Sequence, residues 1–413
     1  MKISNRKIHF FNPGHEDAIR TGKSHYTPPA AVCKMMNDLS FLPAWYGQEG
    51  DFVIINETDE TFRFLLSIPS AIRPAVSLCT TTPPLPAPVE AAPWGLSPHS
   101  IRFFEKISLS DGHLIIPPWK EQYARLTGRQ TALACLSKIR SLLPEYFESL
   151  TLPCFCSTPD EIRRFMATYP PPYLLKTPYS CSGRGLYRMQ TNDFDLQTSR
   201  WLEGAFKKQG VVSIEPALDK VCDFAMEFYA NGCGQIRFEG LSVFETSSKD
   251  TYTGNLLGSQ SFLEQQMSAF VPMTQLWEIQ EAVATIWTEV AGSDYRGYLG
   301  VDMLVYRINN AFAVHPIIEI NLRYTMGLVA LQLSRRLVHP SATGKLLITF
   351  DKMLHSAYRT HLQMKAQYPL LIVDNKISSG YLSLCPVTTE THYRAYVLIE
   401  TVRSKNENFA DVK

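Results

Sequence analysis

The sequence has no excess of charge of either sign. Its 40 Lys and Arg residues balance 39 Asp and Glu residues, and the formal net charge is +1. Proteins that bind nucleic acids or anionic membrane surfaces usually carry a basic excess or a block of Lys and Arg. Neither feature is visible here, so we expect no nucleic acid and no membrane among the partners of this chain.

Long hydrophobic runs are absent too. No segment approaches the ~18 consecutive apolar residues of a membrane-spanning helix, and the pair Phe10-Phe11 is too short for the core of a signal peptide. The nine cysteines include no C-x-x-C pair, so the usual zinc-ligand spacing is missing. Their odd number and irregular spacing are typical of reduced thiols, and we therefore expect a cytoplasmic protein.

What is present suits a large globular chain. The sequence has 413 residues, of which 45% are hydrophobic, enough for two or three domains around a sizeable core. Buried strands at 7–11 and 51–56 flank a helical pattern at 28–41. This alternation predicts a parallel α/β domain at the N-terminus, ending near the turn signal Pro117-Pro118.

A lysine and a glycine-containing loop form the first motif with chemical content. The strand predicted at 173–176 ends in Lys176, and a small polar loop that includes Ser182, Gly183 and Gly185 follows. A lysine supplies a point charge for phosphate, and glycines let backbone N–H groups approach phosphate oxygens closely. The same residues also fit an ordinary hairpin turn with a lysine at the end of a strand.

A hairpin around the turn Asn309-Asn310 forms the second motif. Strand alternation puts Glu319 and Asn321 on one face of its second arm, and the pairing brings Asp302 of the first arm beside Glu319. Two carboxylates and an amide oxygen are ligands that suit magnesium. An exposed polar strand face is the alternative, but the neighbouring valine and isoleucine residues favour burial, where unpaired carboxylates are very costly.

Together these motifs resemble the ATP-grasp superfamily. In that family a strand lysine and a glycine-rich loop hold the ATP phosphates, which Lys176 and its loop match. A carboxylate, followed by Glu-x-Asn on a neighbouring strand, holds two magnesium ions, which the Asp302, Glu319 and Asn321 set matches. Arg323, two residues after Asn321, resembles the biotin carboxylase and carbamoyl phosphate synthetase branch, in which this arginine lies near the acyl phosphate.

Four further residues follow in the order that the resemblance implies. Glu215 lies in a segment similar to the hinge strand that meets adenine, and Asp223 corresponds to the acid near the ribose. Arg129 replaces the family's first phosphate-binding lysine, which keeps the charge but changes the contact geometry. Lys249 resembles a loop lysine that reaches the γ-phosphate in some members, although an exposed loop lysine explains it equally well.

The resemblance also implies an architecture with both α/β and α+β parts. A parallel α/β pre-ATP-grasp domain would span residues 1–118 and would be followed by a two-lobed ATP-grasp domain. The small lobe is expected at 119–205, and the large lobe with a C-terminal extension at 206–413.

The implied activity is that of an ATP- and magnesium-dependent carboxylate–amine ligase. Lys176 and Arg323 would act on the phosphates, and a small-molecule carboxylate would be activated as an acyl phosphate before an amine attacks it. A phosphotransferase and a non-catalytic nucleotide-binding protein are the alternatives. Neither the two substrates nor the oligomeric state follows from the sequence.

One stretch in the N-terminal domain has two interpretations. His15, Glu16 and Arg20 follow the first predicted strand, at the end where α/β proteins bind ligands. They could therefore contact a substrate. The simpler interpretation is the start of a helix, where acidic residues are favourable.

Overall fold

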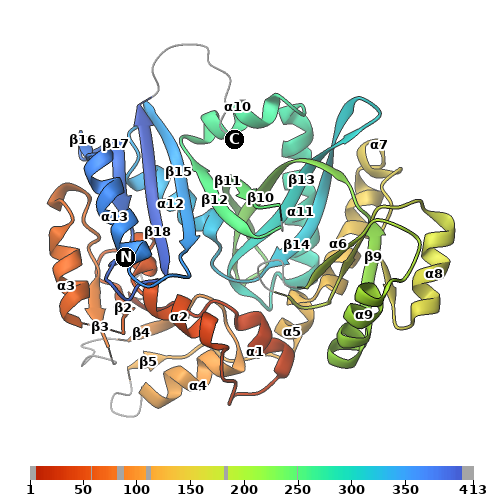
Figure 1. Ribbon diagram of the computed structural model, residues 1–413, viewed down its shortest axis with the longest axis horizontal. Helices are drawn as coiled ribbons and strands as arrows, with labels where there is room; N and C mark the ends of the chain where they lie inside the picture. The colour runs from red at the N-terminus through yellow and green to blue at the C-terminus, as the bar shows by residue number, and fades with distance from the viewer. Residues whose placement is uncertain are drawn as a thin grey trace.

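In the computed structural model, the described residues form three β-sheets (Figure 1). The structure describes residues 6–56, 58–80, 88–107, 113–180, 185–248 and 250–401. Figure 1 shows the N-terminal elements below the large sheet, whereas the smaller antiparallel sheet, with α8 and α9, lies at its right-hand side. The predicted combination of a parallel N-terminal part with mixed α+β parts is confirmed.

The N-terminal sheet is parallel throughout its described strands, in the order β3-β2-β1-β4-β5. The strands are β1 (Arg6–Phe10), β2 (Phe52–Ile54), β3 (Ser77–Cys79), β4 (Val89–Pro93) and β5 (Leu114–Ile115). The associated helices are α1 (His15–Thr21), α2 (Ala30–Asp38), α3 (Thr58–Ser67) and α4 (Pro98–Ile107), with 3-10 turns η1 (Leu42–Trp45) and η2 (Ser70–Ile72).

The two faces of this parallel sheet pack against different partners. On one face, Ile8, Ile54 and Val89 pack with Phe104 of α4. On the other face, residues of the N-terminal domain share a core with the C-terminal strands, namely Phe11, Val53, Ile55, Trp94, Leu346, Ile377 and Val397. This shared core fixes the N-terminal sheet against the rest of the molecule, because its burial excludes water from both sides.

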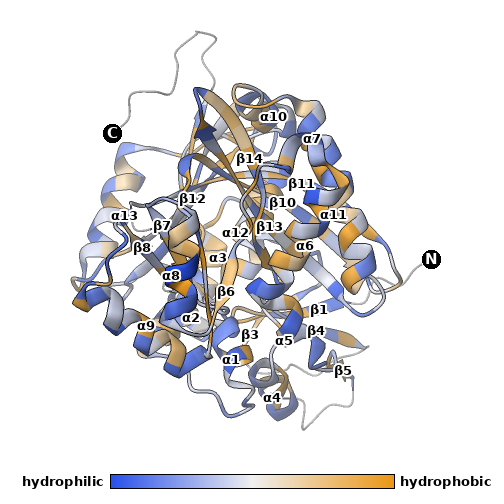
Figure 2. Ribbon diagram, turned by 90° about the vertical axis from the view of Figure 1, so that its right-hand side faces the viewer, coloured by the Kyte–Doolittle hydropathy of each residue, from blue (hydrophilic) through white to orange (hydrophobic). Residues whose placement is uncertain are grey.

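The smaller sheet is antiparallel, with its described strands in the order β6-β9-β7-β8. Its strands are β6 (Cys154–Cys156), β7 (Tyr173–Lys176), β8 (Leu186–Met189) and β9 (Val212–Pro216), covered by α8 (Pro159–Thr168) and α9 (Leu196–Gln209). Helix α8 begins with a capping box, in which the backbone N–H of Glu161 donates to Thr158 Oγ1 at 3.3 Å. Figure 2 shows both apolar and polar residues on α9, as expected for a helix with one buried face.

The large sheet runs β14-β13-β10-β11-β12-β15-β18-β17-β16, and its neighbouring strands pair antiparallel. Its strands are β10 (Asp219–Asn231), β11 (Ile236–Thr246), β12 (Tyr252–Leu257), β13 (Arg296–Ile308), β14 (Ala311–Asn321), β15 (Ala342–Phe350), β16 (Leu371–Val373), β17 (Lys376–Ser383) and β18 (Tyr393–Thr401). The remaining helices are α5 (Gln122–Thr127), α6 (Arg129–Leu142), α7 (Pro144–Phe147), α10 (Gln260–Ser268), α11 (Met273–Ala291), α12 (Met326–Arg336) and α13 (Ser356–Gln367).

The pairing of the strands and the packing of the helices do not follow the predicted boundary at residue 205. β9 lies beyond the predicted boundary at 205, yet it pairs with β6 and β7 of the smaller sheet. Helices α6 and α11 pack together against the large sheet, so part of the segment 119–205 contributes to that core. The predicted division into three domains stays a prediction. Among the described helices, none is both long and apolar enough to cross a membrane.

Candidate active site

Strands β10, β13 and β14 present a polar face and an apolar face. Asp302 of β13 lies opposite Glu319 of β14. Gly300 of β13 lies between Asn321 of β14 and Glu227 of β10. Paired residues point to the same side of a sheet, so the carboxylate and amide groups share one face. The opposite face is apolar and packs against α6 and α11. The predicted hairpin and the predicted neighbourhood of Asp302 and Glu319 are both present in this register.

Burial and mutual repulsion disfavour the ionised form of Asp302 on this face. Burial, followed by the charge of Glu319, raises the pKa of Asp302 to about 7, although Arg323 and a hydrogen bond from Asn321 oppose the shift. Asn321 Nδ2 donates to Asp302 Oδ2 at 3.1 Å. A divalent cation would relieve the repulsion between the two carboxylates.

The donor set fits magnesium better than a metal held by the protein alone. Within the described ranges, no group of three or more His, Cys, Asp and Glu side chains is placed to hold a metal ion. The set is instead two carboxylates, Asp302 and Glu319, with the amide of Asn321. Magnesium is usually held by one or two carboxylates, with substrate phosphates and water completing its coordination.

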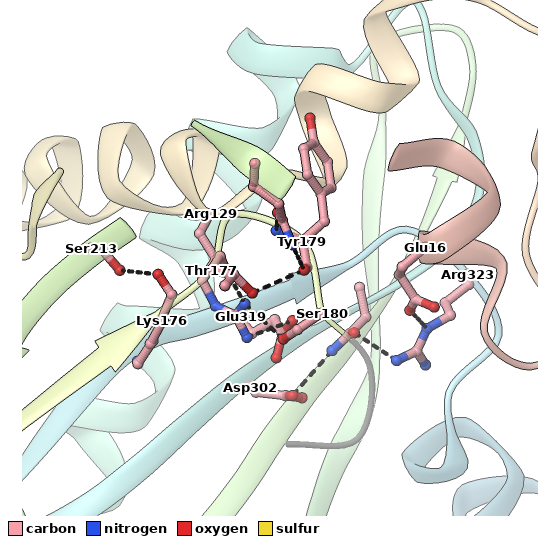
Figure 3. A network of polar contacts seen from close by, with 12 residues as sticks. Glu16, Arg129, Lys176, Thr177, Tyr179, Ser180, Ser213, Asp302, Glu319 and Arg323 are labelled. Atoms are coloured by element: carbon pink, nitrogen blue, oxygen red, sulfur yellow. Dashed lines mark hydrogen bonds and ion pairs between the residues drawn. The ribbon is translucent and has the colours of Figure 1, made fainter. Parts of the chain in front are cut away.

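Arg129 connects this face to the loop after β7. Its Nη2 lies 3.1 Å from Glu319 Oε1, and its Nη1 donates to the carbonyl oxygen of Thr177 at 2.7 Å and to Ser180 Oγ at 2.9 Å (Figure 3). The residue is buried at the start of α6. Arginine offers several donors in a planar fork, which explains how one side chain makes all three contacts.

The base of the predicted phosphate loop is closely packed. The backbone N–H of Thr177 donates to the carbonyl oxygen of Gly185 at 2.9 Å. A Cβ atom at Gly185 would lie 2.3 Å from Thr177 Oγ1 and 2.4 Å from Ser180 Cβ, so no side chain fits there. The predicted contacts Ser182 and Gly183, and also Lys249, lie outside the described residues.

Lys176 and Glu215 form a buried ion pair between β7 and β9, the two central strands of the smaller sheet. Lys176 Nζ lies 2.5 Å from Glu215 Oε1, and the two residues are 4% and 8% exposed. His315 of β14 lies near this pair. Burial first, opposed by Glu215 and assisted by Lys176, lowers the pKa of His315 to about 4, so the imidazole is neutral at pH 7. Two of the predicted nucleotide contacts are thus brought together.

Arg323 is held by a residue of the N-terminal domain. Its Nε lies 2.8 Å from Glu16 Oε1, and its Nη2 donates to Asn321 Oδ1 at 2.8 Å (Figure 3). His15 Nδ1 lies 3.1 Å from the second oxygen of Glu16. Although burial alone would raise it, the pKa of Glu16 is lowered by His15 and Arg323, which keeps the carboxylate ionised. Arg20 points elsewhere and pairs with Asp17 at 3.3 Å.

Asp223 lies farther along the same polar face. It accepts hydrogen bonds from Lys220 Nζ at 2.7 Å and from Thr246 Oγ1 at 2.8 Å. Its charge makes a small contribution to the raised pKa of Asp302. Asp223 therefore shares the face of Asp302 and Glu319, but its direct partners are Lys220 and Thr246, and its contact with the ribose stays a prediction.

Glu227 is a buried acid on this face that none of the sequence motifs predicts. This side chain is 2% exposed, and its Oε2 accepts a hydrogen bond from Thr325 Oγ1 at 2.8 Å. Burial and the charge of Asp302 raise the pKa of Glu227 to about 8, while Thr325 and Arg323 oppose the shift. A Cβ at Gly327 would lie 2.1 Å from Glu227 Oε1. An acid within the otherwise apolar segment 224–228 was the available signal.

Comparison with known proteins gives matches in structure only. No protein-family model matches the sequence, and no curated protein sequence matches it either. The biotin carboxylase of Campylobacter jejuni, solved with β,γ-ATP, is 10% identical and superposes with a TM-score of 0.51 over 95% of this chain and 87% of its own.

A second solved structure agrees with the first. The biotin carboxylase domain of the Hydrogenobacter thermophilus 2-oxoglutarate carboxylase, in complex with MgADP, ADP and bicarbonate, is 11% identical with a TM-score of 0.51. The superposition covers 95% of this chain and 86% of that domain. Both similarities lie far below the identity that would establish a shared activity, but they span nearly the whole chain. The chain therefore has the ATP-grasp fold that these carboxylase structures share.

Proposed function

We propose that this protein is an ATP- and magnesium-dependent ligase that activates a small-molecule carboxylate as an acyl phosphate and joins it to an amine. The observation that carries the proposal is the polar face on which Asp302, Glu319 and Asn321 lie together, with Arg129 and Arg323 beside them. The nucleotides bound in the two biotin carboxylase structures, and the MgADP of the second one, support the same assignment.

Asp302, Glu319 and Asn321 would hold magnesium. The bound metal would neutralise phosphate charge and align the γ-phosphoryl group for in-line transfer. The raised pKa of Asp302 supports this role, because a site that disfavours two bare carboxylates favours a divalent cation between them. Arg129 pairs with Glu319 in the protein, and the same guanidinium would hold phosphate oxygens when nucleotide is present.

The nucleotide would lie between the smaller sheet and the polar face. By the resemblance, Lys176 would contact the phosphates and Glu215 would meet adenine, and their ion pair would place the nucleotide over β7 and β9. Asp223 would lie near the ribose. The contacts of Ser182, Gly183, Gly185 and Lys249 with phosphate remain predictions from the resemblance.

Arg323 would stabilise the acyl phosphate. Its guanidinium is fixed between Glu16 and Asn321, so it is oriented before any substrate arrives. Preorganised donors of this kind lower the barrier because they need no rearrangement as charge develops. Glu16 is then a positioning residue, which acts through Arg323 and links the N-terminal domain to the chemistry.

The test combines nucleotide binding with a chemical trap. Ligands that bind only the native state raise the melting temperature, so Mg-ATP should raise that of the wild-type chain. Turnover would be sought as ADP release with pools of small carboxylic acids. Hydroxylamine added in place of the amine should yield a hydroxamate, because it attacks an acyl phosphate directly.

Glu319→Gln provides the critical variant. It keeps the shape of the side chain but removes one charge from the proposed metal site, so most ADP release should be lost. Glu289→Gln is the matched control, since Glu289 is exposed on α11 and pairs only with Lys138 in the described structure. Full turnover by Glu319→Gln would exclude the metal role. A stable phosphorylated product without hydroxamate would instead identify a phosphotransferase.

A further inference from the structure

A cavity lies farther along the same face of the large sheet, past Glu227 and Gly300, where Tyr229 and Tyr298 pair and the N-terminal sheet approaches. It encloses about 270 Å³. Its lining comes from the amino end of β1, the segment between η1 and β2, strands β10, β11 and β13, and helix α12. Among the residues that the structure describes, none of those predicted for the ATP site lines it, and Glu16 follows the opposite, carboxyl end of β1.

Two buried polar atoms at this cavity lack a hydrogen-bond partner among the described residues. His9 and Tyr46 are 2% and 5% exposed, and both line the cavity. Over the part of the chain that the structure describes, His9 Nδ1 and the Tyr46 hydroxyl have no hydrogen-bond partner. Because unsatisfied buried polar atoms are costly, each such atom calls for a bound molecule that satisfies it.

The neighbours of His9 determine what its free nitrogen can do. His9 Nε2 lies 3.0 Å from Asp51 Oδ2, and Asp51 also accepts the backbone N–H groups of Lys7 and Gln48, each at 2.8 Å. Burial lowers the pKa of His9, although Asp51 opposes the shift, so the ring is neutral. Nε2 then donates to Asp51, which leaves Nδ1 as an acceptor that requires a donor from a ligand.

The walls of the cavity are aromatic and suit a flat ring. Tyr46 and Tyr324 stack at 4.6 Å between ring centroids with an interplanar angle of 23°. The ring centroid of Tyr298 lies 5.2 Å from that of Tyr324, and the ring centroid of Tyr229 lies 5.0 Å from that of Tyr298. Aromatic side chains favour offset-stacked or edge-to-face contacts with a further ring.

One cation at the cavity is available to an anionic ligand. Lys7 lines the cavity and forms no ion pair with any residue that the structure describes. Arg237 also lines it, but its guanidinium is already paired with Glu239. A carboxylate on a ligand would therefore find its partner in the Lys7 amine.

We propose that this cavity binds a small, planar aromatic acid that carries a hydrogen-bond donor. The ring lies against the tyrosines, the carboxylate pairs with Lys7, and the donor reaches His9 Nδ1. The Tyr46 hydroxyl hydrogen-bonds the same molecule. The volume is slightly below that of typical drug-sized sites, which suits a ligand with one or two fused rings.

The experiment titrates three aromatic acids into the nucleotide-free, full-length chain by calorimetry. The acids are 4-hydroxybenzoate, anthranilate and indole-3-carboxylate, and 4-hydroxybenzyl alcohol serves as the uncharged probe. At least one acid should bind saturably at micromolar to millimolar concentration. The alcohol should bind about tenfold more weakly than 4-hydroxybenzoate, because it lacks the charge-assisted contact.

Three variants locate the site. Lys7→Met should weaken binding of the acid about tenfold and leave binding of the alcohol unchanged. Gln332→Trp should abolish both, because the larger side chain from α12 fills the cavity. Lys23→Met, at an exposed lysine of the same domain, should change neither. All three should keep the melting-temperature response to Mg-ATP, so this test does not depend on the proposed ligase activity.

Two results would overturn the proposal. If none of the three acids binds the wild-type chain at millimolar concentration, the cavity holds water only, since a buried water can also satisfy His9 Nδ1 and the Tyr46 hydroxyl. If an acid binds equally well to wild type, Lys7→Met and Gln332→Trp, it binds elsewhere. In either case the proposed ATP site would be unaffected, because none of its described residues lines this cavity.

Discussion

The two faces of strands β10, β13 and β14 are built from alternate residues of the same segments, yet they differ completely in chemistry. Phe224, Val301 and Ile320 point into the core against α6 and α11. Asp302 and Glu319, one residue away along their strands, point to the opposite side and carry charge. Since the side-chain period of a strand is two, stability and chemistry can be assigned to adjacent positions. Substitutions on the two faces should therefore separate the two properties.

The largest expected effect is on the apolar face. Phe224 is completely buried within the large core, so Phe224→Ala should lower the free energy of unfolding by about 3–5 kcal/mol through lost burial and a residual cavity. Phe350→Ala is the control, because that ring is 56% exposed on β15 and should cost far less. Chemical denaturation measures both. Equal losses would mean that Phe224 does not anchor the core behind the polar face.

The polar face should show the reverse behaviour. Arg323→Ala should leave the fold and Mg-ATP affinity largely intact but remove about 2–4 kcal/mol of transition-state stabilisation, as expected for a donor that acts on developing charge. Arg323→Lys should restore little, because an ammonium cannot reproduce two contacts made by a planar fork.

Lys176 offers the sharpest contrast to Arg323, because it should act in the ground state. Lys176→Ala should weaken Mg-ATP binding, and Glu215→Gln shows how much of that loss arises from disturbing the buried pair itself. Calorimetric titration with Mg-ATP measures the affinities of all variants. If Arg323→Ala loses affinity as strongly as Lys176→Ala, Arg323 contacts the nucleotide rather than the acyl phosphate.

How far the sequence predicts this site depends on the range of the contacts. The hairpin and the shared face of Asp302, Glu319 and Asn321 follow from local alternation and a short turn. The structure has both the hairpin and the shared face. The ion pair between Glu16 and Arg323 joins residues 307 positions apart, and no local pattern encodes it. The interpretation of Glu16 as the start of a helix agrees with its place in the first turn of α1, but it does not include the contact with Arg323.

The Arg129–Glu319 pair illustrates the same limit. Motif order predicts both residues for the site, Arg129 for phosphate and Glu319 for metal. Their direct contact arises only because α6 packs against β14, which depends on the complementary apolar surfaces of the whole large core. Glu227 was missed for a related reason, since its position beside Gly300 and Gly327 depends on strand register and on the start of α12.

Glu16→Gln should have an intermediate effect. It removes the charge that orients Arg323, so turnover should fall by about 1.5–3 kcal/mol of activation free energy while Mg-ATP affinity is kept. Asp17→Asn is the matched control, because that neighbouring acid pairs with Arg20 instead. Steady-state rates of both variants, measured once a substrate is found, make the comparison. Equal rates for Glu16→Gln and wild type would show that the N-terminal domain does not position Arg323.

A further effect concerns the pH dependence of stability and comes from Glu227. Burial raises the pKa of Glu227 from 4.5 to about 8, so the folded chain binds more protons than the unfolded chain between these values. The free energy of unfolding must then fall as the pH rises through this window. The raised pKa of Asp302 acts in the same direction, from 3.8 to about 7.

Glu227→Gln should remove the Glu227 contribution and flatten the dependence. Relative to wild type, the variant should gain about 1 kcal/mol or more between pH 5 and pH 8, since one pKa unit corresponds to ~1.4 kcal/mol. Urea unfolding at pH 5, 6.5 and 8 measures this difference. Glu289→Gln, at an exposed carboxylate on α11, should run parallel to wild type. If Glu227→Gln also runs parallel to wild type, Glu227 is ionised in the folded protein, and the polar face must supply a compensating charge to it.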